Sequence, residues 1–196
     1  MPLSKFNATY LENLKMENTV SILTIMNKIA AIVTKDMEDI NIKDRSDQAV
    51  ENFKEGYNCA QSVVLAYADL YPVDVEMLKM LAAPFGAGMG RLREVCGAVS
   101  GIFMILGMES PVTKPNDKTT KTATYSAVQR TALTFQDKMG SYICADLLKI
   151  GRQPQDPTPD DRNNEYYAKR PCAYCVAVAA EILGKELVKL RNNIVE

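Results

Sequence analysis

Hydrophobic positions recur with helical spacing along most of the chain, and no segment shows the sustained alternation of a strand. Over residues 17–35, Val20, Leu23 and Met26 fall three residues apart, which predicts an amphipathic helix. The same periodicity dominates the later segments. We therefore expect an all-α fold, a compact multi-helix bundle of about seven or eight helices.

Capping residues and helix breakers divide this pattern into successive helices. Polar N-caps and a favourable first-turn proline predict helix starts near Asp44, Asn58, Asp74, Glu94, Asp117, Ser141 and Pro171. Glycines such as Gly56, Gly107 and Gly140 mark the ends of helices. On the helix over 117–138 we expect Tyr125 and Phe135 in the core, and we expect Met80 in the core as well.

The first predicted helix contains no cysteine and looks separable from the rest of the chain. We expect residues 1–44 to form an N-terminal helical extension and residues 45–196 to form a cysteine-containing helical domain. The extension is a candidate arm for docking or for a homodimer contact.

The bulk composition narrows the classes of function. The chain has 196 residues, of which 47% are hydrophobic, and a net charge of −1, so no basic surface indicates nucleic acid. The longest apolar stretch, Val95 to Met108, is too short to cross a bilayer. The first residues lack the pattern of a signal peptide, and we expect a cytoplasmic protein without a membrane span. In a reducing compartment, cysteines indicate redox or metal chemistry more than structural disulfides.

Five cysteines and no histidine form the main chemical signal of the sequence. The cysteines are Cys59, Cys96, Cys144, Cys172 and Cys175. Each is predicted at the start of a helix or within its first turns, where the helix dipole favours thiolate over thiol. The absence of histidine removes the usual general base and the usual zinc partner of cysteine. Sulfur is therefore the first candidate for any chemistry.

The segment Cys96–Gly101 carries a face of small residues. Gly97, Ser100 and Gly101 lie on one side of the predicted helix, so another backbone can approach closely. This face indicates either tight helix packing with an incidental Cys96, or a device that brings Cys96 against another cysteine-bearing helix or a ligand. Glu94 is a candidate acceptor for a thiol proton, or an electrostatic cap of the helix.

The segment Phe85–Gly90 is rich in glycine without being a nucleotide loop. Arg91 stands where the third glycine of a dinucleotide fingerprint belongs, and no strand precedes the segment. One interpretation is a tight connection with positive φ angles. The other is a backbone nest, flanked by Arg91 and Arg93, that holds an anion or a cluster. The candidate cofactor-binding residues are Gly86, Gly88, Gly90 and Arg91.

Cys172 and Cys175 form a C-x-x-C pair at a helix start, outside the βαβ setting of thioredoxin-like proteins. Together with the other cysteines, the pair offers enough thiolates for a zinc or iron–sulfur site. The candidate ligands in that alternative are Cys59, Cys96, Cys144 and Cys175. The long gaps between the cysteines mean that the fold, and not a local knuckle, has to assemble any site.

Several of these motifs, in this order, closely resemble the C-GCAxxG-C-C family of redox-active proteins. The resemblance rests on Gly56–Val63, Phe85–Gly90, Cys96–Gly101, Cys144 and a final cysteine, and it covers residues 45–185. It implies an all-α domain with four signature cysteines. These correspond to Cys59, Cys96, Cys144 and one of the two cysteines of the C-x-x-C pair.

The leading hypothesis is a redox-active protein that uses cysteine thiols for thiol–disulfide exchange or electron transfer, with a thiol-dependent oxidoreductase as its enzymatic form. Cys96 is the expected central thiolate, Cys59 and Cys144 its neighbours, and Cys172 or Cys175 the resolving thiol. A redox partner protein or a small thiol is the expected partner. The alternatives are a zinc or iron–sulfur protein with four cysteine ligands, and a non-catalytic helical interaction module with buried cysteines. The cofactor is left open between none, zinc and an iron–sulfur cluster.

Overall fold

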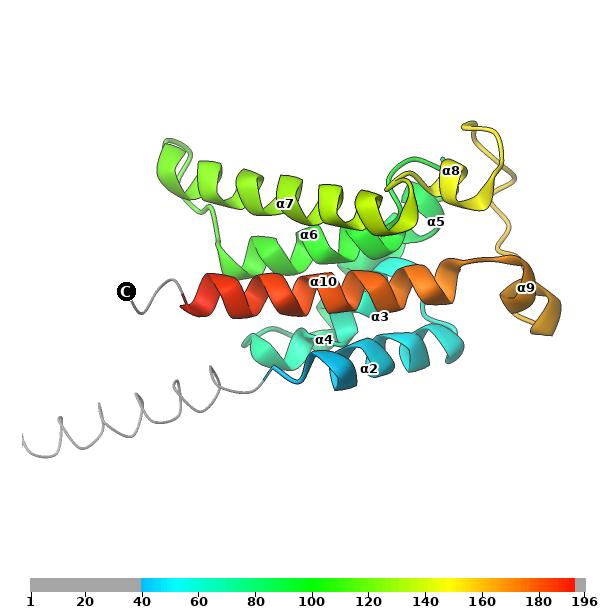
Figure 1. Cartoon of the computed structure of the whole chain (residues 1–196), viewed down its shortest axis with the longest axis horizontal. Coiled ribbons are helices and arrows are strands. Elements are labelled where there is room, and N and C mark those ends of the chain that lie inside the picture. The colour runs from blue at the N-terminus through cyan, green and yellow to red at the C-terminus, as the bar shows by residue number, and fades with distance from the viewer. Residues whose placement is uncertain (1–39, 193–196) are drawn as a thin grey trace, which may run out of the picture. The chain divides into compact units, whose positions relative to one another are not determined.

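The computed structural model describes residues 40–192, which form helices joined by turns and loops, without a strand. The helices are α2 (Ile42–Lys54), α3 (Cys59–Leu65), α4 (Val75–Ala82), α5 (Gly86–Met89), α6 (Gly97–Glu109), α7 (Lys118–Met139), α8 (Cys144–Leu148), α9 (Asn164–Lys169) and α10 (Cys172–Asn192) (Figure 1). The predicted all-α class is confirmed. The predicted helix over 17–35 and its dimer contact lie outside the described residues. Within 40–192, no helix is both long enough and apolar enough to span a membrane.

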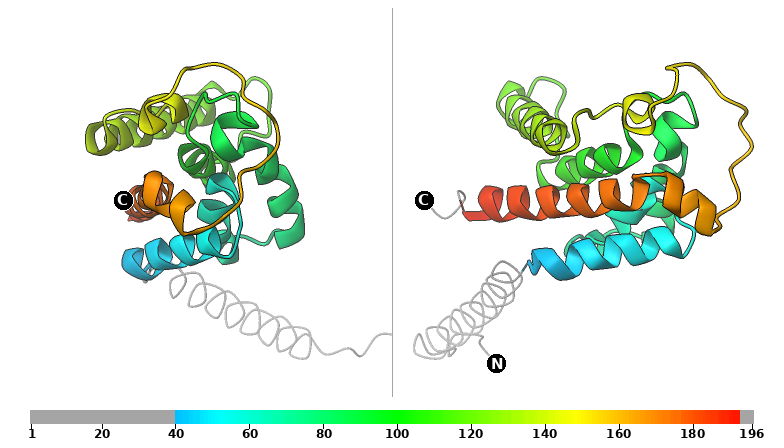
Figure 2. Two further views of the ribbon diagram at one scale, coloured as in Figure 1. Left: turned by 90° about the vertical axis from the view of Figure 1, so that its right-hand side faces the viewer. Right: turned by 45° about the vertical axis from the view of Figure 1, so that its right-hand side comes forward.

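Helix α10 is the centre of the bundle. It lies between α2 on one side and α6 and α7 on the other, and Figures 1 and 2 both show this arrangement. Its buried side chains include Val176, Leu183 and Leu187, and α6 presents buried residues on almost every side. The hydroxyl of Tyr67, which follows α3, donates a hydrogen bond of 2.7 Å to the Ala180 carbonyl of α10. Helix α6 is apolar on almost every side, as expected for a helix that other elements cover and that has no wide face in water.

Side-chain caps explain where several helices begin. Asn58 caps α3 in a reciprocal capping box with Gln61, and Asp74 and Asp117 cap α4 and α7 as predicted. Helix α2 begins at Ile42, ahead of the predicted start at Asp44, because the Asn41 side chain already accepts the Asp44 N–H. The short helix α9 was not predicted; the Asn163 side chain caps it.

Two predicted core positions are wrong. Tyr125 is 60% exposed and Met80 is 66% exposed, whereas Phe135 is fully buried as expected. Helix α7 buries only a narrow stripe, which runs through Ala127, Thr131 and Phe135. For Tyr125 the reason is that α7 lies at the edge of the bundle, where, among the described helices, it packs mainly against α6 and α10.

A partly buried ion pair joins the C-terminal ends of α6 and α10. Two nitrogens of the Arg191 guanidinium donate to the two carboxylate oxygens of Glu109, at 2.9 and 2.8 Å. The Tyr71 hydroxyl donates to the same carboxylate at 2.6 Å. Because bidentate geometry and low exposure strengthen an ion pair, this contact fixes the two helices at the end opposite the cysteines.

Candidate functional site

All five cysteines line one cavity of about 240 Å³. They are Cys59, Cys96, Cys144, Cys172 and Cys175. Cys59, Cys144 and Cys172 are the first residues of α3, α8 and α10, while Cys96 is the N-cap of α6 and Cys175 lies in the first turn of α10. The predicted placement at helix starts is therefore confirmed. Four helix N-termini that are far apart in the sequence meet at this cavity.

The small-residue face of α6 brings two of these helices together. A Cβ atom added to Gly97 would lie 2.8 Å from the Phe85 carbonyl oxygen and 3.1 Å from the Cys59 Cβ. A Cβ atom on Gly101 would lie 2.9 Å from the Ala60 carbonyl oxygen. The packing interpretation of this face is confirmed, and the helix that it packs against carries Cys59.

A single β-bridge places Cys96 beside Cys144. Val95 pairs with Ile143 in an antiparallel bridge, just ahead of α6 and α8. The Cys96 N–H donates to the Tyr142 carbonyl at 2.9 Å, and the Cys144 N–H donates to the Glu94 carbonyl at 2.7 Å. These hydrogen bonds hold the starts of α6 and α8 side by side.

The glycine-rich segment winds into a left-handed turn. Ala87, Met89 and Arg91 have φ angles of 54°, 62° and 70°, and the glycines between them are also positive. The Gly90 N–H donates to the Gly86 carbonyl at 2.9 Å, which closes the turn. A left-handed conformation costs about 1–2 kcal/mol for each residue with a Cβ. The predicted connection with positive φ angles is confirmed, and the non-glycine residues in it are strained.

Two glycines of this segment allow close approach of neighbouring elements. A Cβ on Gly86 would lie 2.5 Å from the Asn58 side chain, and a Cβ on Gly88 would lie 2.6 Å from the Cys144 Cβ. Gly86, Gly90 and Arg91 line the cavity, whereas Gly88 packs behind Cys144 without lining it. The role of these residues in binding a cofactor stays a prediction.

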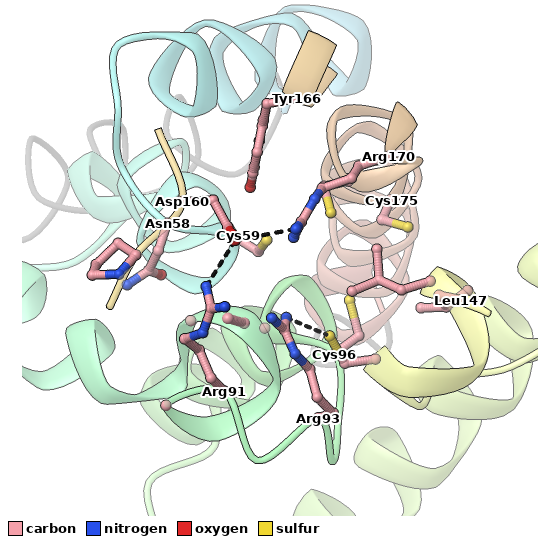
Figure 3. Close-up of a pocket in the computed structure, with 18 of the residues that line it drawn as sticks. Asn58, Cys59, Arg91, Arg93, Cys96, Leu147, Asp160, Tyr166, Arg170 and Cys175 are labelled. Carbon is pink, nitrogen blue, oxygen red and sulfur yellow. Dashed lines mark hydrogen bonds and ion pairs between the residues drawn. The ribbon is translucent and has the colours of Figure 1, made fainter. Parts of the chain in front are cut away.

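Arg93 is a buried cation beside the cysteines. Arg93 is only 1% exposed, and its Nε and Nη2 donate hydrogen bonds to the Gln155 side-chain oxygen at 2.9 and 2.7 Å. Its Nη1 contacts the Cys144 sulfur at 3.9 Å. Figure 3 shows the Arg93 side chain pointing into the cavity, close to Cys96. A buried guanidinium raises the local positive potential, which favours a thiolate.

Cys172 is the cysteine best suited to be a nucleophile. It is partly exposed, whereas the other four cysteines are buried. A hydrogen bond from Cys59, aided by the charges of Arg170 and Arg162, lowers the pKa of Cys172 to about 7 from its ordinary value. The same hydrogen bond, together with burial, raises the pKa of Cys59. The two shifts are therefore opposite: Cys172 is shifted toward the thiolate and Cys59 away from it.

Cys96 and Cys175 are a second pair, and Cys144 stands beside both pairs. A hydrogen bond with Cys175 and burial together raise the pKa of Cys96 well above its ordinary value. Burial is also the main reason that the pKa of Cys144 rises to about 11. This environment keeps Cys96 protonated and does not support its expected role as the central thiolate. At Cys96 the hydrogen bond with Cys175 and burial outweigh the effect of the helix start, and at Cys144 burial outweighs it.

Several residues of the cavity were missed by sequence reasoning. Asp160, Arg162, Tyr166 and Arg170 line it, and Gln155 holds Arg93. They belong to the loop before α9, to α9 and to the residues just before Cys172, which the sequence showed as a proline-rich connection and a helix start. The one available signal was the Arg170-Pro171-Cys172 sequence, since a cation next to a cysteine favours its thiolate.

Two further expectations concern Glu94 and metal binding. The Glu94 side chain is exposed and is not among the cavity residues, so it is not placed to accept a thiol proton.

Between residues 40 and 192, no three His, Cys, Asp or Glu side chains are grouped as the ligands of a metal ion. The geometry gives no support to the zinc or iron–sulfur alternative, which stays a prediction.

Residues 57–186 match the model of a protein family described as "Putative redox-active protein (C_GCAxxG_C_C)". The chain belongs to this family. The matched span contains all five cysteines of the cavity. No curated protein and no solved structure matches the chain.

Proposed function

We propose that this protein carries out thiol–disulfide exchange, with Cys172 as the attacking sulfur and Cys59 as the resolving thiol. The observation that carries the proposal is the pairing of a partly exposed cysteine with a buried one across two helices, inside a cavity lined by arginines. The pair joins α10 to α3 and does not follow the C-x-x-C spacing.

The chemistry needs no histidine. The Cys172 thiolate attacks one sulfur of a disulfide substrate, and a mixed disulfide forms while the other substrate sulfur leaves as a thiolate and takes up a proton. The Cys59 thiol then loses its proton and attacks the Cys172 sulfur, which releases the second half of the substrate. The balance is one substrate disulfide reduced to two thiols and one Cys59–Cys172 disulfide formed.

The environment of Cys59 suits this order of events. Its hydrogen bond to Cys172 is the first cause of its raised pKa. That cause disappears once the Cys172 sulfur is bound in a mixed disulfide and no longer carries a negative charge. Cys59 is thus held protonated in the resting protein and becomes easier to deprotonate when it has to react.

The Cys96–Cys175 pair provides a second dithiol in the same cavity. Cys175 lies one turn after Cys172 on α10, so the two pairs share a helix. We propose that this second pair is oxidised after the first, because both Cys96 and Cys175 are buried whereas Cys172 is partly exposed.

The test is to oxidise the reduced protein with one equivalent of a small disulfide and to map the disulfides by mass spectrometry. The expected first product is the Cys59–Cys172 disulfide. Cys59→Ser should accumulate a mixed disulfide on Cys172, whereas Cys172→Ser should greatly slow the oxidation. Cys175→Ser is the matched control, because it should still form the Cys59–Cys172 disulfide.

A different first product would overturn the proposal. A Cys172–Cys175 disulfide would assign the reaction to the C-x-x-C pair. A protein that does not react with small disulfides while it remains folded would exclude thiol–disulfide exchange at this site.

A further inference from the structure

The cavity is rich in positive charge. Four arginine side chains line it against one acidic side chain, Asp160. The arginines are Arg91, Arg93, Arg162 and Arg170. Even with the Cys172 thiolate included, the lining keeps an excess of positive charge. A site of this kind attracts anions and raises their local concentration.

Most of these arginines already have partners. Arg91 and Arg170 share the Asp160 carboxylate, at 2.7 and 3.1 Å, and Figure 3 shows both side chains reaching it. Arg162 donates to the backbone carbonyls of Phe53 and Tyr57, at 2.9 and 3.2 Å. One carboxylate therefore serves two guanidinium groups, and it does not neutralise both.

Arg93 differs from the other three. Among the described residues, no carboxylate lies within ion-pairing distance of its guanidinium, whose partners are the neutral Gln155 amide oxygen and the Cys144 sulfur. Burial of a cation is costly unless an anion compensates it. The Arg93 guanidinium, buried at the wall of a cavity without a carboxylate partner, is suited to bind a ligand that carries a negative charge.

A second polar group of the cavity also lacks a partner. The Nε of Arg91 is buried and makes no hydrogen bond, and the Arg91 side chain is only 14% exposed. Buried side-chain donors are satisfied in the great majority of cases, so an open one beside a cavity indicates a missing acceptor. Arg91 and Arg93, at the end of the left-handed segment and just after it, have positive φ angles of 70° and 64°, and both side chains point into the cavity (Figure 3).

We infer that the substrate of this site is a small disulfide that carries a carboxylate or a similar anionic group. The inference rests on the proposed thiol–disulfide exchange and names its substrate class. The anionic group pairs with Arg93, and the substrate sulfur meets Cys172. Arg93 and Cys172 line the same cavity of about 240 Å³, so one small molecule can contact both groups.

The size of the cavity agrees with a small substrate. Its volume of about 240 Å³ lies below the range of about 300–1,000 Å³ that is usual for ligand pockets. The reaction is thiol–disulfide exchange, so the substrate disulfide supplies the oxidising equivalents. Two protein thiols become one disulfide, and the substrate leaves as two thiols, at least one of which carries the anionic group.

The test compares three small symmetrical disulfides of different charge. These are 3,3′-dithiodipropionate, which is anionic, 2-hydroxyethyl disulfide, which is neutral, and cystamine, which is cationic. The rate of oxidation of the reduced full-length protein by each is divided by its rate with dithiothreitol under the same conditions, which removes intrinsic differences in reactivity. The normalised rate should be highest for the anionic disulfide, by about tenfold over the neutral one, as expected for one charge-assisted contact. The cationic disulfide should be slowest.

Variants assign the preference to Arg93. In Arg93→Gln the ratio of the anionic to the neutral rate should fall severalfold toward one, whatever happens to the absolute rates, because only the general attraction of the other arginines remains. Arg152→Gln is the control, because Arg152 is half-exposed, pairs with Asp146 and is not a cavity residue. Its ratio should match that of the unmodified protein. If circular dichroism shows that Arg93→Gln does not fold, Arg91→Gln replaces it and should lower the same ratio.

The outcomes separate the two proposals. Equal normalised rates for the anionic and neutral disulfides in the unmodified protein overturn the substrate class and leave the exchange reaction standing. An Arg93→Gln variant that slows all three disulfides equally shows that Arg93 acts on the thiolate alone, which also overturns the substrate class. No reaction with any of the three overturns the exchange reaction itself.

Discussion

Replacement of Cys59 by alanine tests the thiolate assignment directly. In the unmodified protein, the hydrogen bond from Cys59 is the largest cause that lowers the pKa of Cys172 to about 7, from an ordinary 9.0. Arg170, Arg162 and Arg93 contribute less. Cys59→Ala removes the hydrogen bond and keeps the arginines. The pKa of Cys172 should therefore rise part of the way back.

The size of the effect follows from the fraction of thiolate. A group with a pKa of about 7 is half ionised at pH 7, and each rise of the pKa by one pH unit corresponds to about 1.4 kcal/mol. A rise of about one pH unit lowers the thiolate fraction at pH 7 about fivefold, and a full return to 9.0 lowers it about fiftyfold. We expect the rate constant for Cys172 at pH 7 to fall within this range.

The assay is alkylation by iodoacetamide, followed by mass spectrometry of the peptide that contains Cys172, from about pH 5 to pH 10. Because the thiolate is the reactive form, the rate rises about tenfold per pH unit below the pKa and then reaches a plateau. The midpoint should lie near 7 in the unmodified protein and higher in Cys59→Ala. Cys175→Ala is the matched control: it removes a thiol of the same helix that pairs with Cys96, so the midpoint of Cys172 should stay where it was.

Two results would refute this reasoning. A midpoint for Cys172 near 9 in the unmodified protein would mean that the cavity does not stabilise its thiolate. A low midpoint that stays unchanged in Cys59→Ala would mean that the arginines alone lower the pKa. Either result would remove Cys59 from its role in activating Cys172.

Three further predictions concern stability, measured by urea unfolding of the reduced protein. Gly101→Ala should be less stable than Gly107→Ala by about 1–3 kcal/mol, because the added Cβ meets α3 at position 101 and open space at position 107; equal stabilities would contradict the close helix contact. Glu109→Gln should cost about 2–4 kcal/mol by leaving Arg191 partly buried without its carboxylate, and a loss below about 0.5 kcal/mol would show that the pair is unimportant. Between pH 9 and 11, Cys144 alone should lower the free energy of unfolding by up to about 1.4 kcal/mol per pH unit. The reason is that the thiol ionises near pH 9 in the unfolded chain, whereas in the folded protein its pKa is raised to about 11 and it stays protonated. Cys144→Ala should weaken this pH dependence.

Local signals were sufficient for much of the fold. The N-caps Asn58, Asp74 and Asp117 set helix starts in the sequence and in the structure alike, because a cap needs only its own first turn. Burial was harder to predict. Tyr125 has the right spacing for a core position but is exposed, because α7 is covered only along a narrow stripe at the edge of the bundle.

The sequence predicted only some of the residues that line the cavity. The cysteines and the nest-like segment Phe85–Gly90 were found from residue type and spacing. Arg162, Arg170 and Asp160 were not, since nothing in a proline-rich connection shows that it folds over the thiols. Contacts between distant segments have no local signature, so only the fold reveals them.

The sequence by itself determined that five cysteines stand at helix starts, that no histidine is present, and that a glycine face allows α6 to approach another helix. The tertiary structure decided which sulfurs meet and in which direction the pKa of each thiol shifts. A helix start favours a thiolate through its dipole, but burial disfavours any charge, and the balance depends on groups brought in from elsewhere. A hydrogen bond with Cys175 and burial raise the pKa of Cys96, and burial raises the pKa of Cys144, whereas at Cys172 a hydrogen bond from Cys59 and nearby arginines lower the pKa.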